Sequence, residues 1–194
     1  MSQPQNTLAV IFAPLAVAFP HVVDAVEQSG WACRLPMDLN EDLEKDVGMI
    51  LIDGREPMPD LHGRPVVVAI AANGVSPVFP ADVVIDPAHD VAGIVAQLAP
   101  WRIPGVDALA RMADMFGRDG LLPVVEGLRV ELERALSGPD HADPHRIAGL
   151  SGTLGFGAAS ASWQAVDRGE GEWDAALRDS RTVLIAIDGW MRRS

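Results

Sequence analysis

The chain has 194 residues, 48% of them hydrophobic, and a formal net charge of −12 at pH 7. This length allows one large domain or two small domains, and the hydrophobic content is ample for packed cores. An acidic chain without a basic patch is a poor candidate for nucleic-acid binding, because nucleic acid is bound largely by neutralising its phosphates. We therefore expect no nucleic-acid partner.

Residues 1–99 alternate short apolar runs with helical or loop stretches. Near-continuous apolar runs of this length are typical of strands buried on both faces of a parallel sheet. Five such runs occur, at 8–12, 31–35, 48–52, 65–70 and 82–85. Helices are expected over 19–30 and 90–98, whereas the segments 36–47 and 71–80 have weaker patterns that leave helix or loop open. The pattern predicts an α/β domain with a five-stranded parallel sheet, wound on both faces.

The segment 99–105 contains two prolines and a glycine, which predicts a semi-rigid linker. After it the hydrophobic period becomes 3.6 and stays so to the end of the chain. Apolar stripes at this period predict five helices, at 106–116, 121–136, around His145, at 158–166 and at 173–191. A short helix followed by four longer ones is typical of a helical bundle. We place the two domains at 1–99 and 105–194.

The third of these helices carries an unusual combination of residues around His145. At helical spacing His145, Gly149, Gly152 and Phe156 fall on one face. Another face carries an apolar stripe, Ile147, Leu150 and Leu154. Each interior glycine costs a helix about 1 kcal/mol relative to alanine, so the glycines need a reason. We expect that they let another protein's backbone approach the imidazole.

This segment resembles the signature of histidine phosphotransfer (HPt) domains, His-x-Ile/Leu-x-Gly-x-Ser/Ala-x-x-Leu-Gly. The matching positions are His145, Ile147, Gly149, Ser151, Leu154 and Gly155. The signature spans only about a dozen residues, although the helical pattern around it covers the last half of the chain. The resemblance implies an HPt-type four-helix bundle that passes a phosphoryl group between receiver aspartates of a phosphorelay. His145 would be the phospho-acceptor, and the partners would be receiver domains of a hybrid histidine kinase or of response regulators.

The same resemblance places a partner-binding surface around the histidine, at Arg146, Ala148, Gly149, Gly152 and Phe156. The family usually has a lysine where this chain has Ala148, so a cation near the phosphoryl group is missing or comes from elsewhere, for example from Arg146. Pro144 predicts a helix that begins late or bends just before the histidine. No ATP-binding domain is visible, so we expect a phosphotransfer intermediate without kinase activity.

The first half resembles, in outline, a response-regulator receiver domain whose chemistry has been lost. Residues 50–53 match the third strand and its phospho-accepting aspartate, Asp53. The acidic pair, the Thr or Ser and the Lys-Pro of that family are replaced by Ala13-Pro14, by alanines and by Asp86-Pro87. Phosphoryl transfer to a carboxylate depends on a metal and a cation. We therefore expect a pseudo-receiver in which Asp53 caps a turn with Gly54.

Scarce residue types exclude other chemistry. Lys45 is the only lysine, whereas P-loop and protein-kinase signatures need one that contacts phosphate. Cys33 is the only cysteine, which predicts no disulfide framework and no cysteine metal cluster, and we expect it to be a small buried hydrophobe. The residues indicate neither a metal nor a cofactor.

The apolar run 8–19 is too short to cross a bilayer and no positive charge precedes it, so we expect a cytoplasmic protein.

Two other functions stay open. In the first, the chain binds a histidine kinase or response regulator without phosphotransfer, as a scaffold or inhibitor; Ala148 favours this alternative and the glycines beside His145 oppose it. In the second, an α/β protein with a helical cap binds a small ligand in a phosphate cradle. The cradle would be the glycine cluster Gly149, Gly152, Gly155 and Gly157, but these residues lie in a helical pattern rather than after a strand.

Overall fold

The computed structural model describes residues 7–35, 47–58, 65–72 and 74–192. The chain divides into two compact units, Met1–Arg102 and Ile103–Ser194. The division falls inside the segment 99–105, where the sequence predicts a linker. The first half of that segment forms a 3-10 helix, η1 (Ala99–Trp101), which packs against the preceding helix and buries Trp101.

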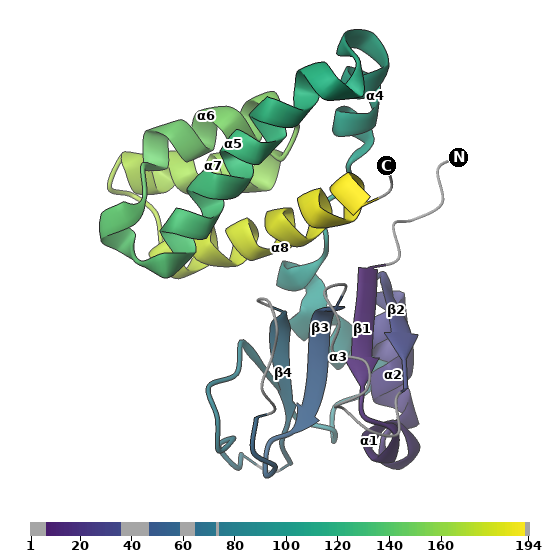
Figure 1. The fold of residues 1–194 in the computed structure, drawn as a ribbon. Helices are drawn as coiled ribbons and strands as arrows, with labels where there is room; N and C mark the ends of the chain where they lie inside the picture. Colours follow the sequence, from purple (N-terminus) through teal and green to yellow (C-terminus); the bar gives the residue numbers. More distant parts are fainter. Residues whose placement is uncertain (1–6, 36–46, 59–64, 73, 193–194) are drawn as a thin grey trace. The chain divides into compact units, whose positions relative to one another are not determined.

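The first unit contains the predicted five-stranded parallel sheet (Figure 1). Its strands are β1 (Thr7–Ile11), β2 (Trp31–Arg34), β3 (Val47–Asp53), β4 (Val66–Ile70) and β5 (Val83–Ile85). The order in space is β2-β1-β3-β4-β5, and every pairing is parallel. Flavodoxin-like α/β proteins have the same order. All of β4 and the interior of β3 are buried, which explains why these strands are apolar at consecutive positions.

The α-helices described in the first unit are α1 (Ala13–Ala18), α2 (Pro20–Gln28) and α3 (Val91–Leu98). Helix α2 packs against both α3 and β2, and Figure 1 shows α2 and α3 on the same face. Asp90 caps α3 by accepting a hydrogen bond from the Gly93 N–H at 2.8 Å. The predicted helix 19–30 corresponds to α2, and the short helix α1 precedes it.

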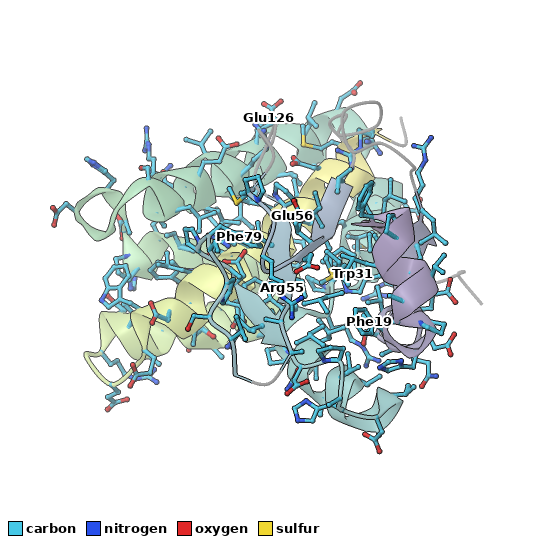
Figure 2. All side chains as sticks on the ribbon, turned by 90° about the horizontal axis from the view of Figure 1, so that it is seen from below. Phe19, Trp31, Arg55, Glu56, Phe79 and Glu126 are labelled. Carbon is cyan, nitrogen blue, oxygen red and sulfur yellow. The ribbon has the colours of Figure 1, made fainter. Side chains whose placement is uncertain are left out.

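On the opposite face, the described residues that connect β3 to β4 and β4 to β5 form loops and turns rather than helices. The described residues of the segment 71–80 form such a loop, and most of 36–47 lies outside the described residues. Figure 2 shows the side chain of Phe79, from the loop before β5, together with Arg55 and Glu56, which follow β3. Phe79 packs in a small cluster with four strand residues, Ile50, Ile52, Val67 and Ala69. An aromatic side chain from a loop thus covers strand positions on a face of the sheet where a helix was expected.

The second unit contains each of the five predicted helices. They are α4 (Asp107–Phe116), α5 (Arg118–Ser137), α6 (Pro144–Thr153), α7 (Gly157–Asp167) and α8 (Trp173–Arg192), with a 3-10 turn η2 (Pro139–His141) between α5 and α6. Helix α6 packs against α5 and α7, and α8 packs against α7 and α5, while α4 packs on α5. The apolar stripes of these helices meet in one core.

The centre of that core includes Trp163, which is completely buried on α7. Its indole N–H donates to the Ser180 hydroxyl at 2.9 Å, and that hydroxyl donates to the Ala176 carbonyl of α8 at 2.8 Å. The indole N–H of Trp163 and the hydroxyl of Ser180 are thereby satisfied. Leu128 and Leu132 of α5 are fully buried beside them, and each contributes about 2 kcal/mol of hydrophobic stabilisation. No helix among the described residues is long and apolar enough to cross a membrane.

Candidate functional site

His145 lies in the first turn of α6. Asp143 is the N-cap, and its carboxylate accepts a hydrogen bond from the Arg146 N–H at 3.0 Å. Pro144 occupies the first helical position, where its missing N–H costs nothing. Of the two expectations for Pro144, a late start of the helix is therefore the one observed. The His145 side chain is 89% exposed, which leaves its ring open to a partner.

The imidazole of His145 has an acidic partner on the neighbouring helix. Its Nδ1 lies 3.1 Å from Oδ2 of Asp167, the last residue of α7. An ionised carboxylate only accepts hydrogen bonds, so in the neutral ring this contact assigns the proton to Nδ1. The lone pair then lies on Nε2, for which no hydrogen-bond partner is present among the described residues. Such a nitrogen is a nucleophile that points into solvent.

Arg146 is held on the other side of α6. Its Nε lies 3.4 Å from Oε1 of Glu131 on α5, and Nη1 of Arg134 lies 3.2 Å from the same oxygen. The Glu131 side chain is only 4% exposed, so two guanidinium groups balance one buried carboxylate. Successive helical residues point about 100° apart, which directs His145 towards α7 and Arg146 towards α5. Arg146 therefore does not stand beside the imidazole as a replacement for the family's lysine.

The two glycines near His145 play different structural roles. A Cβ on Gly149 would meet nothing within 4 Å, so this position leaves an open surface one turn from the imidazole. A Cβ on Gly152 would lie 3.0 Å from Oγ of Ser160 on α7. That hydroxyl donates to the Ala148 carbonyl at 2.9 Å and links α7 to α6. Gly152 thus permits the close approach of two helices, and both it and Gly149 are exposed near His145.

The expectation that Phe156 shares the exposed face of His145 is wrong. Helix α6 ends at Thr153, and Gly155 turns the chain with φ +86°. The Phe156 N–H donates to the Ser151 carbonyl at 2.8 Å, and the Gly155 N–H donates to the Gly152 carbonyl at 3.2 Å. This is a Schellman motif, whose hydrophobic residue after the glycine packs back onto the protein. Phe156 is accordingly buried and no longer follows the helical spacing.

Ala148 is buried as well, on the inner face of α6 next to Ile147. Ala148 and Phe156 therefore offer no surface to a partner, whereas Arg146, Gly149 and Gly152 are exposed. The predicted apolar stripe faces the core as expected: Ile147 and Leu154 are buried, and Leu150 is partly buried. The exposed surface around His145 therefore includes the glycines of the predicted stripe but not its phenylalanine.

Asp53 lies at the end of β3 and takes part in a turn. Its Oδ1 accepts a hydrogen bond from the Arg55 N–H at 2.9 Å, as expected for a residue that caps a turn with Gly54. The Gly54 carbonyl in turn accepts from the Val78 N–H at 2.9 Å. Among the described residues, no three His, Cys, Asp or Glu side chains are grouped as metal ligands would be. The Asp53 carboxylate is thus engaged locally.

Cys33, on β2, is half-buried. Burial, aided by the negative charge of Glu27, raises the pKa of its thiol to about 12. Only a thiolate is an effective nucleophile, so the protonated thiol is inert near neutral pH.

Sequence reasoning missed Asp167 and Glu131. Both act across helices, and the pairing of His145 with Asp167 joins residues 22 apart in sequence. One signal could have found Asp167: when two helices are joined by a short turn they run antiparallel, and residues at similar distances from the turn meet. No comparable signal exists for Glu131, because a longer connection precedes α6.

No protein-family model matches the chain, and no curated protein or solved structure matches it.

Proposed function

We propose that the chain is a histidine-containing phosphotransfer protein that relays a phosphoryl group between receiver aspartates through His145. The observation that carries this proposal is the exposed imidazole of His145, with Nδ1 bonded to Asp167 and Nε2 directed to solvent. Gly149 supports it by leaving open space one turn along the helix. In this proposal α5 to α8 form an HPt-type four-helix bundle, with α4 as an additional helix.

The chemistry would use a positioned nucleophile on a rigid helix. Nε2 attacks the phosphorus of an aspartyl phosphate, and the carboxylate of the donor leaves with the electrons of the P–O bond. The receiver supplies the metal that neutralises the phosphoryl oxygens. The amino-terminal end of α6 carries partial positive charge, which favours an anionic group on His145. A second receiver then takes the phosphoryl group from Nε2.

The first unit fits a pseudo-receiver that serves docking or association rather than phosphorylation. Its strand order and the position of Asp53 at the end of β3 support the receiver-like interpretation. The hydrogen bond from Arg55 to Asp53 supports a structural role for that carboxylate. Receiver domains and their partners meet in the cytoplasm, so the proposal includes that location.

One observation favours the alternative of a non-catalytic scaffold or inhibitor. Among the described residues, the side-chain partner of His145 is the carboxylate of Asp167, and the guanidinium of Arg146 is bound to Glu131. A protein without a cation at the imidazole could bind a kinase or receiver and transfer nothing. Binding without transfer would establish this alternative.

The test is a transfer assay with the full chain and a panel of receiver domains carrying ³²P-labelled aspartyl phosphate. We expect rapid loss of label from one or more receivers and its appearance on this protein as acid-labile, alkali-stable phosphate. His145→Gln should remove the label, and His141→Gln, a change at a neighbouring exposed histidine on η2, should retain it. Label on the His145→Gln protein would refute the assignment.

A further inference from the structure

Helix α4 leaves two large apolar side chains in water. The helix packs mainly on α5, and its inner side carries Leu109, which is fully buried. At its carboxyl end, however, the side chains of Met115 and Phe116 are 68% and 69% exposed. A single exposed apolar residue is ordinary, whereas large apolar side chains grouped on a surface are typical of an interaction site. The corner between α4 and α5 is therefore a candidate for contact with a partner.

The charged residues on the outward face of α4 form a self-complementary pattern. Asp107, Arg111 and Asp114 follow at spacings of four and three residues, so they share one side of the helix, and all three are exposed. Within the described part of the chain, none of these three side chains forms an ion pair. If two copies of α4 lie antiparallel about a two-fold axis midway between Met112 and Ala113, Arg111 of each copy is level with Asp114 of the other. A parallel pair in register would instead place like charges side by side.

The apolar residues of α4 fit the same antiparallel arrangement. Met115 of each copy is then level with Ala110 of the other, and Ala110 is an exposed residue small enough to leave room for the longer side chain. The dipoles of the two helices also oppose each other, which is the favourable orientation. A two-fold interface uses the same patch on both copies, so it requires a surface that matches itself in this way.

We infer that α4 is a docking surface for a second copy of this chain, through an antiparallel contact of α4 with α4 that pairs Arg111 with Asp114 and covers Met115 and Phe116. The inference does not depend on the proposed function. A contact built on a ten-residue helix is small beside the interfaces of permanent dimers. The dimer should therefore form at high protein concentration and dissociate on dilution.

This contact would leave His145 open in both copies. Helix α4 meets the end of α6 where Ala108 lies against the Gly155 turn. His145 lies at the opposite end of α6, a helix of ten residues and thus about 15 Å long. Association through α4 and exposure of the imidazole are therefore compatible.

The first experiment is sedimentation equilibrium of the full chain over a series of protein concentrations. We expect the average mass to rise with concentration towards twice the mass of one chain. Met115→Ser should shift the midpoint to a concentration at least about tenfold higher, because each dimer loses two apolar contacts. Val130→Ser is the matched control: this valine of α5 is 42% exposed, lies outside the proposed contact and should leave the midpoint unchanged.

The second experiment exchanges the charges. Arg111→Asp sets acids against acids in the proposed dimer, and Asp114→Arg sets arginines against arginines, so each variant alone should remain monomeric. A mixture of the two variants should associate, because both facing pairs then have opposite charges again. Native mass spectrometry identifies the mixed dimer by its mass, and circular dichroism checks that each variant is folded.

Three results would overturn the inference. The first is an average mass of one chain at every concentration, which would leave the α4 surface to another protein. The second is a dimer that survives both Met115→Ser and Arg111→Asp, because its contact would lie elsewhere. The third is a mixture of folded Arg111→Asp and Asp114→Arg chains that does not associate, since opposite charges would then not face each other.

Discussion

The Nε atom of Arg146 lies 3.4 Å from Oε1 of Glu131, and the carboxylate is nearly closed off from solvent whereas the guanidinium is 59% exposed. Glu131 thus fixes the direction in which the side chain of Arg146 extends from α6. This pairing explains why a cation adjacent to His145 in sequence is not adjacent to it in space.

Glu131→Gln should lower the free energy of unfolding by only about 1 kcal/mol. The amide fills the same volume, and the two arginines it leaves unpaired, Arg134 and Arg146, are more than half exposed and remain hydrated. Urea unfolding at neutral pH measures the change. Glu133→Gln, at a half-exposed acid two residues further along α5, is the control and should cost less. A loss of about 4 kcal/mol would contradict this view, since such a value marks an uncompensated buried charge.

Gly149→Ala and Gly152→Ala should have different effects on stability although both replace a glycine of α6. The first should raise the free energy of unfolding by about 0.5–1 kcal/mol, because alanine favours the helix and its methyl group enters open space. The second places the methyl group 3.0 Å from Oγ of Ser160 and disturbs its bond to the Ala148 carbonyl, which offsets the gain. Thermal and urea unfolding of the two variants provide the comparison, and equal gains would contradict the assignment of Gly152 to the helix contact.

The sequence predicted most of the fold because the signals that define it are local. The 3.6 period identified all five helices of the second unit, and it placed Ile147 and Leu154 on the buried face. Apolar runs identified the five strands for the same reason. Phe156 escaped this reasoning because one glycine in the left-handed region ended the helix, and the spacing was continued past its last residue.

The candidate site was only half predictable. His145 stands out through its neighbours along the helix, so the sequence identifies it. Asp167 and Glu131 act through contacts between helices, which depend on packing angles that a single sequence does not encode in a local pattern. The helix face towards which a side chain points, such as that of Arg146, follows only once the neighbouring helices are in place.

Gly155→Ala should be clearly destabilising, by about 2 kcal/mol or more. A positive φ costs an alanine residue about 1–2 kcal/mol. At this position the methyl group would also overlap the Cβ of Ala108 on α4. Gly169→Ala separates the two effects, because that glycine also has a positive φ, +73°, but open space around it. Urea unfolding of both variants gives the difference. Equal losses would show that the contact with Ala108 contributes nothing.

Asp53→Asn should leave phosphotransfer unchanged. The amide oxygen of asparagine can still accept the hydrogen bond from the Arg55 N–H, so the turn after β3 should remain. The measurement is the rate at which labelled receivers transfer phosphate to the variant and to the wild type. Disappearance of acid-labile phosphate in Asp53→Asn would mean that the first unit is a working receiver.

Gly149→Leu should block phosphotransfer while leaving the second unit folded. The position is exposed and its Cβ meets nothing, so the larger side chain should not disturb packing, and leucine favours a helix more than glycine does. The same side chain would project beside His145 and hold an incoming receiver beyond the roughly 3–3.5 Å approach that the reaction requires. Gly120→Leu is the control, since this exposed glycine of α5 also has open space at its Cβ and is not part of the proposed partner surface.

The experiment is a transfer time course together with melting curves for both variants. We expect the transfer rate of Gly149→Leu to fall by at least about tenfold, at an unchanged or higher melting temperature, and that of Gly120→Leu to stay at the wild-type value. Normal transfer by a folded Gly149→Leu protein would mean that the partner approaches His145 from another side, such as the surface of α7 that carries Asp167.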